Sequence, residues 1–99
     1  MTTGIKWDAP KDPEEVKDYE LSWVPLLVDG DELVSVVWTV VSPEVTTLAV
    51  DSSTIDVTNT ISTIWLSGGE VGNASVHGHA VTAGGREYEQ TMLLKIKEK

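Results

Sequence analysis

The chain lacks cysteine and phenylalanine altogether, and none of its apolar runs approaches the roughly 20 residues that a membrane-spanning helix requires. Without cysteine, the 99 residues can form no disulfide, no zinc–thiolate site and no thiol nucleophile. A chain of this length is one domain, which buries roughly two-thirds of the surface that its unfolded state exposes. We therefore expect one apolar core without a covalent cross-link.

Basic residues are also scarce. Seven Lys and Arg stand against 16 Asp and Glu, which gives a net charge of −9, and ten of the acids lie in residues 1–50. A negative surface repels the phosphates of nucleic acids and of anionic membranes. The composition therefore predicts no nucleic acid and no membrane as a partner, and solubility is the simplest reason for the acidity.

Helical patterns are nearly absent. The exception is residues 12–16, where Asp12 is placed to cap a single turn that starts at Pro13 and carries Glu15 three residues after the cap. Elsewhere the chain is rich in Val and Thr, whose branched side chains favour strands over helices.

Strand-like runs occupy most of the remaining chain: 18–23, 33–41, 45–50, 54–57, 60–66, 74–83 and 86–97. Turn-forming residues separate them, and Gly84-Gly85 predicts a two-residue hairpin loop because such turns need positive φ. The pattern predicts an all-β fold, an immunoglobulin-like β-sandwich of about seven antiparallel strands. A small closed barrel is the alternative.

Residues 1–14 are predicted to form an extended N-terminal arm, followed by the sandwich in residues 15–99. Proline interrupts regular structure in the arm, and its polar residues cannot build a core. Ile5 and Trp7 are the apolar exceptions. Tryptophan is enriched at interface hot spots because it buries a large area with few rotatable bonds. Both residues are therefore candidates for docking a partner, unless the arm folds back over its own domain.

The core is predicted from the alternation of side chains along the strands. Trp23 lies at an inward position of the first run. In 33–41 the even positions are wholly apolar, and we assign them to the core: Val34, Val36, Trp38 and Val40. In the last run the inward set is Tyr88, Met92, Leu94 and Ile96, which Gln90 interrupts near the loop.

The orientation of Trp65 stays open at this stage. If Ile64 and Leu66 point inward, Trp65 points outward, because neighbours along a strand face opposite sides. An exposed Trp65 would be a candidate interface residue.

His77 and His79 stand two apart on one strand and therefore face the same way. Such a pair can ligate zinc or nickel, with Glu87 or Glu89 across the hairpin, although no third ligand is evident. The simpler interpretation is two solvent-facing polar residues opposite a buried face. Gly78 between them allows close approach, and a core tryptophan is the expected neighbour.

Three further motifs fail the tests for binding or catalysis. Asp29, Asp31 and Glu32 resemble the start of a calcium loop, but the spacing is wrong and no distal Glu completes it. The glycines at 68–72 precede a strand and not the helix that a phosphate cradle needs. No Ser/His/acid grouping is readable. We therefore predict no enzymatic activity, no metal and no cofactor.

Lys95 and Lys97 share one face of the last strand with Lys99 and form a basic stripe on an acidic protein. One interpretation is pairing with acids on the adjacent strand. The other is complementarity to a neighbour's acidic patch, which salt would weaken. On the second interpretation Lys95 and Lys97 are candidate partner-binding residues.

Several short motifs follow one another along the chain: Lys11-Asp12-Pro13, Asp18-Tyr19, Ser22-Trp23, Asp29-Gly30-Asp31, Trp38-Thr39-Val40, Ile64-Trp65-Leu66-Ser67-Gly68-Gly69 and Gly85-Arg86. Together they resemble a family of small tailed-bacteriophage proteins, the fibre–tail adaptor proteins. The resemblance runs from about residue 8 to the end of the chain. It implies an immunoglobulin-like virion component, assembled in the host cytoplasm, with no catalytic residues.

The partners that the resemblance implies are other virion proteins of the tail, the fibre or the head–tail connector, with a symmetric ring as one arrangement of the copies. Two alternatives remain. One is a glycan-binding module that uses Trp65 beside Ser67 and Glu70. The other is a small acidic regulator that blocks a host protein.

Overall fold

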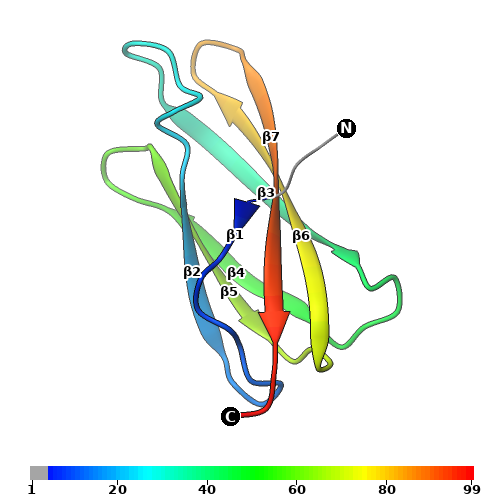
Figure 1. Cartoon of the computed structure of the whole chain (residues 1–99). Coiled ribbons are helices and arrows are strands. Elements are labelled where there is room, and N and C mark those ends of the chain that lie inside the picture. Colours follow the sequence, from blue (N-terminus) through cyan, green and yellow to red (C-terminus); the bar gives the residue numbers. More distant parts are fainter. Residues whose placement is uncertain (1–4) are drawn as a thin grey trace.

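A computed structural model describes residues 5–99 as two β-sheets packed face to face (Figure 1). Its strands are β1 (Ile5–Lys6), β2 (Lys17–Ser22), β3 (Leu33–Ser42), β4 (Ala49–Ile55), β5 (Ile61–Ser67), β6 (Gly72–Thr82) and β7 (Glu87–Ile96). Within these residues no helix is long and apolar enough to cross a membrane.

The sheet order is β1-β7-β6-β3 in one layer and β2-β5-β4 in the other. All neighbouring strands are antiparallel except β1 and β7, which run parallel. The second, fifth and fourth strands thus face the third, sixth and seventh, as in immunoglobulin sandwiches. The predicted immunoglobulin-like, all-β fold is confirmed, and the closed-barrel alternative is wrong because the two sheets are separate.

The core lies between the sheets and is built around packed aromatic rings, which are tilted against one another. The ring centroids of Trp7 and Trp38 are 5.9 Å apart, and those of Trp23 and Trp38 are 6.4 Å apart. The buried indole of Trp23 donates to the hydroxyl of Ser62 at 3.1 Å. The inward positions predicted for Trp23 and Trp38 are confirmed, and these rings fill the centre of a sandwich that has no disulfide.

Gly78 explains how the Trp38 ring fits against β6. Trp38 and Gly78 are directly opposite in the β3–β6 register, and a Cβ atom added at Gly78 would lie 2.9 Å from Trp38 Cζ3. Any larger residue would therefore displace the indole. The tryptophan neighbour predicted for Gly78 is confirmed.

The N-terminal segment is part of the sandwich from Ile5 onward. Ile5 and Lys6 pair with Met92 and Leu93, and the side chain of Trp7 is only 7% exposed. The Trp7 backbone N–H donates to Leu93 O at 3.0 Å, and its indole N–H donates to Glu20 O at 2.9 Å. The partner-docking prediction for Trp7 is wrong. The open side of the core between β7 and β2 accepts the ring and satisfies its one polar atom.

Residues 12–15 form one hydrogen-bonded turn where a helical turn was predicted over 12–16, but none of these residues is helical. The Asp12 N–H donates to Glu15 Oε1 at 2.7 Å, and the Glu15 N–H donates back to Asp12 O at 3.0 Å. Just before the turn, Lys11 is fully buried, and its ammonium donates to Gly68 O at 2.6 Å and Asp12 O at 2.9 Å. Burial lowers the pKa of Lys11, because desolvation disfavours the charged form.

The core face of β3 differs from the prediction at its start. Leu33 is buried, whereas Val34 is 61% exposed. The β3–β6 register shifts between Leu33 and Ser35, and such a bulge exchanges the faces of the residues before it. Beyond the bulge, Val36 and Trp38 point inward as predicted.

Two of the predicted strands are in fact one. The runs 45–50 and 54–57 are replaced by the single strand β4, which contains residues 51–53 and has a bulge between Val50 and Ser52. The polar residues that suggested a turn are tolerated because β4 lies at the edge of its sheet and is mostly exposed. The seventh strand is β1 instead.

The β6–β7 hairpin has a three-residue loop, Ala83 to Gly85, and not the predicted two. The Gly85 N–H donates to Thr82 O at 3.0 Å, and the Thr82 N–H donates to Arg86 O at 2.8 Å. Gly85 has φ of 83°, as three-residue hairpins with a left-handed last residue require. The inward set predicted for β7 holds: Met92, Leu94 and Ile96 are buried, and Tyr88 packs against them from the partly buried end.

Candidate interaction surfaces

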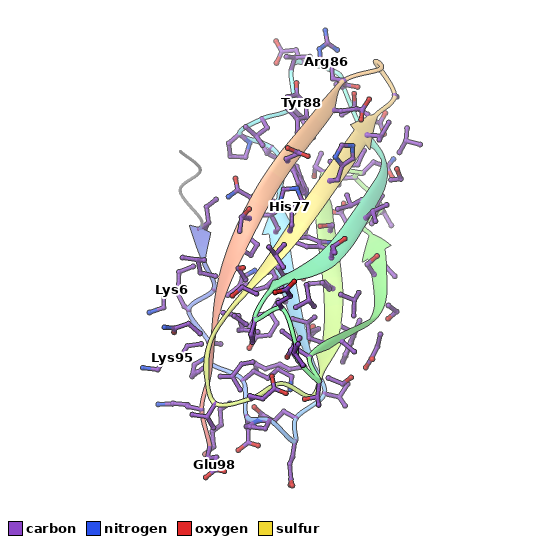
Figure 2. All side chains as sticks on the ribbon, turned by 90° about the vertical axis from the view of Figure 1, so that its right-hand side faces the viewer. Lys6, His77, Arg86, Tyr88, Lys95 and Glu98 are labelled. Carbon is purple, nitrogen blue, oxygen red and sulfur yellow. The ribbon has the colours of Figure 1, made fainter. Side chains whose placement is uncertain are left out.

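The outer face of the four-stranded sheet carries a basic patch, formed by Lys6, Leu93, Lys95 and Lys97. Lys6 lies opposite Leu93 in the β1–β7 register, and Lys95 lies opposite Asn73 on β6. A shallow groove of about 270 Å³ runs among Lys6, Asn73 and Lys95. Figure 2 shows Lys6 and Lys95 projecting from the same side of the molecule.

The basic patch has an apolar centre and no internal counter-charge. Leu93 is 42% exposed, and within residues 5–99 no carboxylate lies within ion-pair distance of Lys6, Lys95 or Lys97. The predicted pairing with acids on the adjacent strand is therefore wrong for Lys95 and Lys97. Opposite Lys95, β6 presents Asn73, and Lys97 lies beyond the end of β7. Only Lys99 of the stripe is paired, to Glu15 at 2.9 Å.

The outer face of the three-stranded sheet carries an acidic patch, formed by Asp18, Glu20, Asp51 and Trp65. Asp18 lies opposite Trp65 in the β2–β5 register, with Glu20 two residues further on. Trp65 is 39% exposed, while its neighbours Ile64 and Leu66 are fully buried. The conditional prediction for Trp65 is thus confirmed: it points outward, into the acidic patch.

The histidines form a third group, beside the basic patch on the four-stranded sheet (Figure 2). His79 Nε2 lies 2.7 Å from Glu87 Oε1, and His77 Nε2 lies 3.5 Å from Glu89 Oε1. The hydrogen bond to the Glu87 carboxylate is the main reason that the pKa of His79 is raised, and the hydrogen bond to Glu89 adds to it. In residues 5–99 no three or more His, Cys, Asp or Glu side chains are arranged to hold a metal ion. The group is a set of half-exposed histidine–glutamate contacts across the hairpin.

The Asp31 carboxylate, in the acidic β2–β3 loop, accepts hydrogen bonds from within the protein. The Asp31 carboxylate accepts from the Gly84 N–H at 2.8 Å and from Arg86 at 3.2 Å, which joins two loops at one end of the sandwich. Hydrogen bonding from Thr82 is the main reason that the pKa of Asp31 is lowered. These contacts give the Asp29–Glu32 turn a structural role.

The Glu70 carboxylate, in the β5–β6 loop, is likewise held by hydrogen bonds from the β3–β4 loop. Its carboxylate accepts hydrogen bonds from the Thr46 hydroxyl and from the Thr47 N–H and hydroxyl, the last two at 2.8 and 2.6 Å. The Thr46 hydroxyl contributes most to a pKa lowered to about 2. Glu70 is therefore not a free sugar ligand beside Trp65, which removes a residue that the glycan-binding alternative relied on.

Ile5 lines an apolar pocket at the edge of the sandwich. Ile5 is 49% exposed and contributes to a pocket of about 140 Å³ with Leu21, Trp23 and Leu26. Leu26 is not among the site residues predicted from the sequence. The apolar run from residue 24 to 28 was the available signal.

The site residues predicted from the sequence thus fall into separate places. Lys95 and Lys97 lie on one outer face, Trp65 on the other, Ile5 at an edge and Trp7 in the core. The two outer faces each have an exposed apolar side chain with charged residues around it.

A profile of the family described as "Podophage GP4 fiber-tail adaptor protein gp77" matches residues 11–95. The chain belongs to this family. The matched segment begins at the buried Lys11, contains both patches apart from Lys6 and Lys97, and confirms the resemblance to phage fibre–tail adaptors. The protein is accordingly a bacteriophage adaptor-family protein with an immunoglobulin-like fold. β1 and Trp7 lie outside the matched segment.

Among solved structures, the chain is similar to the "Solution structure of the PKD domain from KIAA 1837 protein", with 17% identity and a TM-score of 0.47. The similarity covers 100% of this chain and 91% of that domain. At this level it says nothing about function. No curated protein matches the chain.

Proposed function

We propose that this fibre–tail adaptor joins tail and fibre proteins of a podophage virion by surface contacts and without catalysis. The observation that carries the proposal is the family match over residues 11–95, on a fold whose outer faces present unpaired charge around exposed apolar side chains. Apolar anchors surrounded by polar residues are the usual composition of protein interfaces.

The proposed contact residues are Ile5, Trp65, Lys95 and Lys97. Trp65 and Ile5 supply apolar area, and the two lysines supply charge that is not neutralised within residues 5–99. Trp7 is withdrawn from this set, since its ring is part of the core. The negative net charge supports protein partners over nucleic acid or anionic membrane.

The proposal is tested by composition and assembly of the virion. Mass spectrometry of purified particles should detect the protein at a fixed ratio to the tail proteins, and particles made without it should lack fibres. Phage carrying Trp65→Ala should assemble fewer fibres than phage carrying Val57→Ala, a control at an exposed loop position. A protein abundant in infected cells but absent from particles would overturn the proposal in favour of the host-directed regulator.

A further inference from the structure

The basic and acidic patches lie on opposite outer faces of one sandwich, so they cannot contact each other within a molecule. The basic patch surrounds Leu93, which is 42% exposed, and the acidic patch surrounds Trp65, which is 39% exposed. Within residues 5–99, none of the lysines of the first patch and neither Asp18 nor Glu20 of the second has an ion-pair partner.

We infer that the acidic patch of one copy docks on the basic patch of the next copy. The occupant of each patch is thus a second copy of this chain, which names one partner within the proposed adaptor function and rests on it. The supporting observation is that the two surfaces are complementary. Each has an exposed apolar side chain at its centre, and the charges around it are positive on one surface and negative on the other. Such complementarity steers association and fixes which surfaces meet.

The same charges oppose a two-fold dimer through either patch. In a two-fold interface a surface meets an identical surface, so lysines would face lysines or carboxylates would face carboxylates. Head-to-tail contact is the one pairing of these two surfaces that joins opposite charges. Because each copy keeps one patch free, the contact repeats and gives a closed ring or an open chain.

Sedimentation of the full chain tests the inference. At low salt the protein should form species larger than a dimer, and near 1 M salt, where the Debye length is about 3 Å, it should become monomeric. Lys95→Glu with Lys97→Glu makes both patches acidic, and Asp18→Lys with Glu20→Lys makes both basic. Each double variant alone should associate at least about tenfold more weakly than the parent, because its patches now repel.

Mixing the two double variants is the decisive step. Every contact between unlike variants again joins opposite charges, so the mixture should assemble beyond the dimer in a one-to-one ratio. The control variant Asp29→Lys with Glu44→Lys changes the net charge by the same amount as Asp18→Lys with Glu20→Lys. Its changes lie at exposed loop positions away from both patches, so it should associate like the parent. Trp65→Ala should weaken association at unchanged charge.

Two results would overturn the inference. One is a parent chain that stays monomeric at low salt, and the other is a mixture that forms dimers and nothing larger, which is what a two-fold contact would give. A monomeric chain found in purified particles would reject the head-to-tail contact and leave the adaptor function intact. Absence from particles would reject the adaptor function, whatever the sedimentation shows.

Discussion

The two long edges of the sandwich are built differently. At one edge, residues 5–12 run beside β7 and cover the gap to β2, where Trp7 and the ring of Tyr19 stack with centroids 4.8 Å apart (Figure 1). At the other edge, β3 and β4 contact each other, and no further strand of residues 5–99 lies beside them. The first edge is closed by side chains that belong to the core. The second is left open, with bulges in both strands.

The difference shows that a sandwich can solve the problem of unpaired strand edges in two ways. Covering an edge removes it and adds buried area, whereas bulges and polar side chains only make an exposed edge a poor template for pairing. The closed edge should therefore determine stability, and the open edge should determine whether molecules associate by pairing strand to strand.

The largest effect is expected from Trp7→Ala at the closed edge. Removing a buried tryptophan typically lowers the free energy of unfolding by about 3–5 kcal/mol, because a cavity replaces the ring. Urea unfolding of the variant measures the loss. Trp65→Ala removes the same side chain from an outer face and should cost about 1 kcal/mol or less. Equal, small losses in both variants would mean that the N-terminal segment does not hold the core together.

Lys11→Met is expected to have the next largest effect. Methionine has a similar length but cannot donate to Gly68 O and Asp12 O, and hydrogen bonds to charged groups contribute about 1.5–3 kcal/mol. The free energy of unfolding should fall by an amount in this range, while Lys6→Met at an exposed position should change it by less than about 0.5 kcal/mol. An unchanged Lys11→Met variant would show that desolvation of the ammonium cancels its hydrogen bonds.

Sequence patterns predicted the inward faces of the strands better than the pairing of the N-terminal segment. Alternation placed Trp23, Trp38 and the inner residues of β7 correctly, because apolar and polar residues alternate along the sequence of a strand that is buried on one face. The pairing of Ile5 with Met92 leaves no such local signal, because it joins the two ends of the chain. The sequence therefore predicted Trp7 in an N-terminal arm, where a tryptophan fits either partner docking or packing against its own domain.

Bulges and register explain the remaining differences. A bulge in β3 exchanged Leu33 and Val34, and nothing in a β-branched run marks where the extra residue lies. For the candidate surfaces, Trp65 and Lys95 were recognised by parity. Their companions Asp18 and Leu93 were not, because membership of a patch depends on which strands are neighbours in the sheet.

The variant Tyr19→Phe tests how the closed edge contributes to stability at high pH. Burial raises the pKa of Tyr19 to about 12, and its hydroxyl donates to Ala9 O at 2.8 Å across the closed edge. The unfolded chain releases this proton near pH 10, so the folded state binds more protons between about pH 10 and 12. Stability from this group is complete below about pH 10 and is lost as the pH rises through about 12.

The phenylalanine variant lacks the titrating group and one hydrogen bond. At neutral pH it should be less stable by about 1 kcal/mol, and its stability should fall less steeply than the parent's between about pH 10 and 12. Urea midpoints across this range measure both effects. Parallel pH profiles of the two proteins would show that the Tyr19 hydroxyl is not protected in the folded state.

The smallest change in stability is expected at the open edge, from Asp51→Val with Ser53→Val in β4. Both residues are exposed, so the free energy of unfolding should stay within about 0.5 kcal/mol of the parent's. In high salt, where contacts between the charged patches are screened, the variant should nevertheless associate more than the parent, because an apolar β-branched edge is a template for strand pairing. This association should persist in high salt, unlike contact between the charged patches, since backbone hydrogen bonds and apolar burial are not screened. A variant that stays as monodisperse as the parent in high salt would show that the bulge alone is enough to protect this edge.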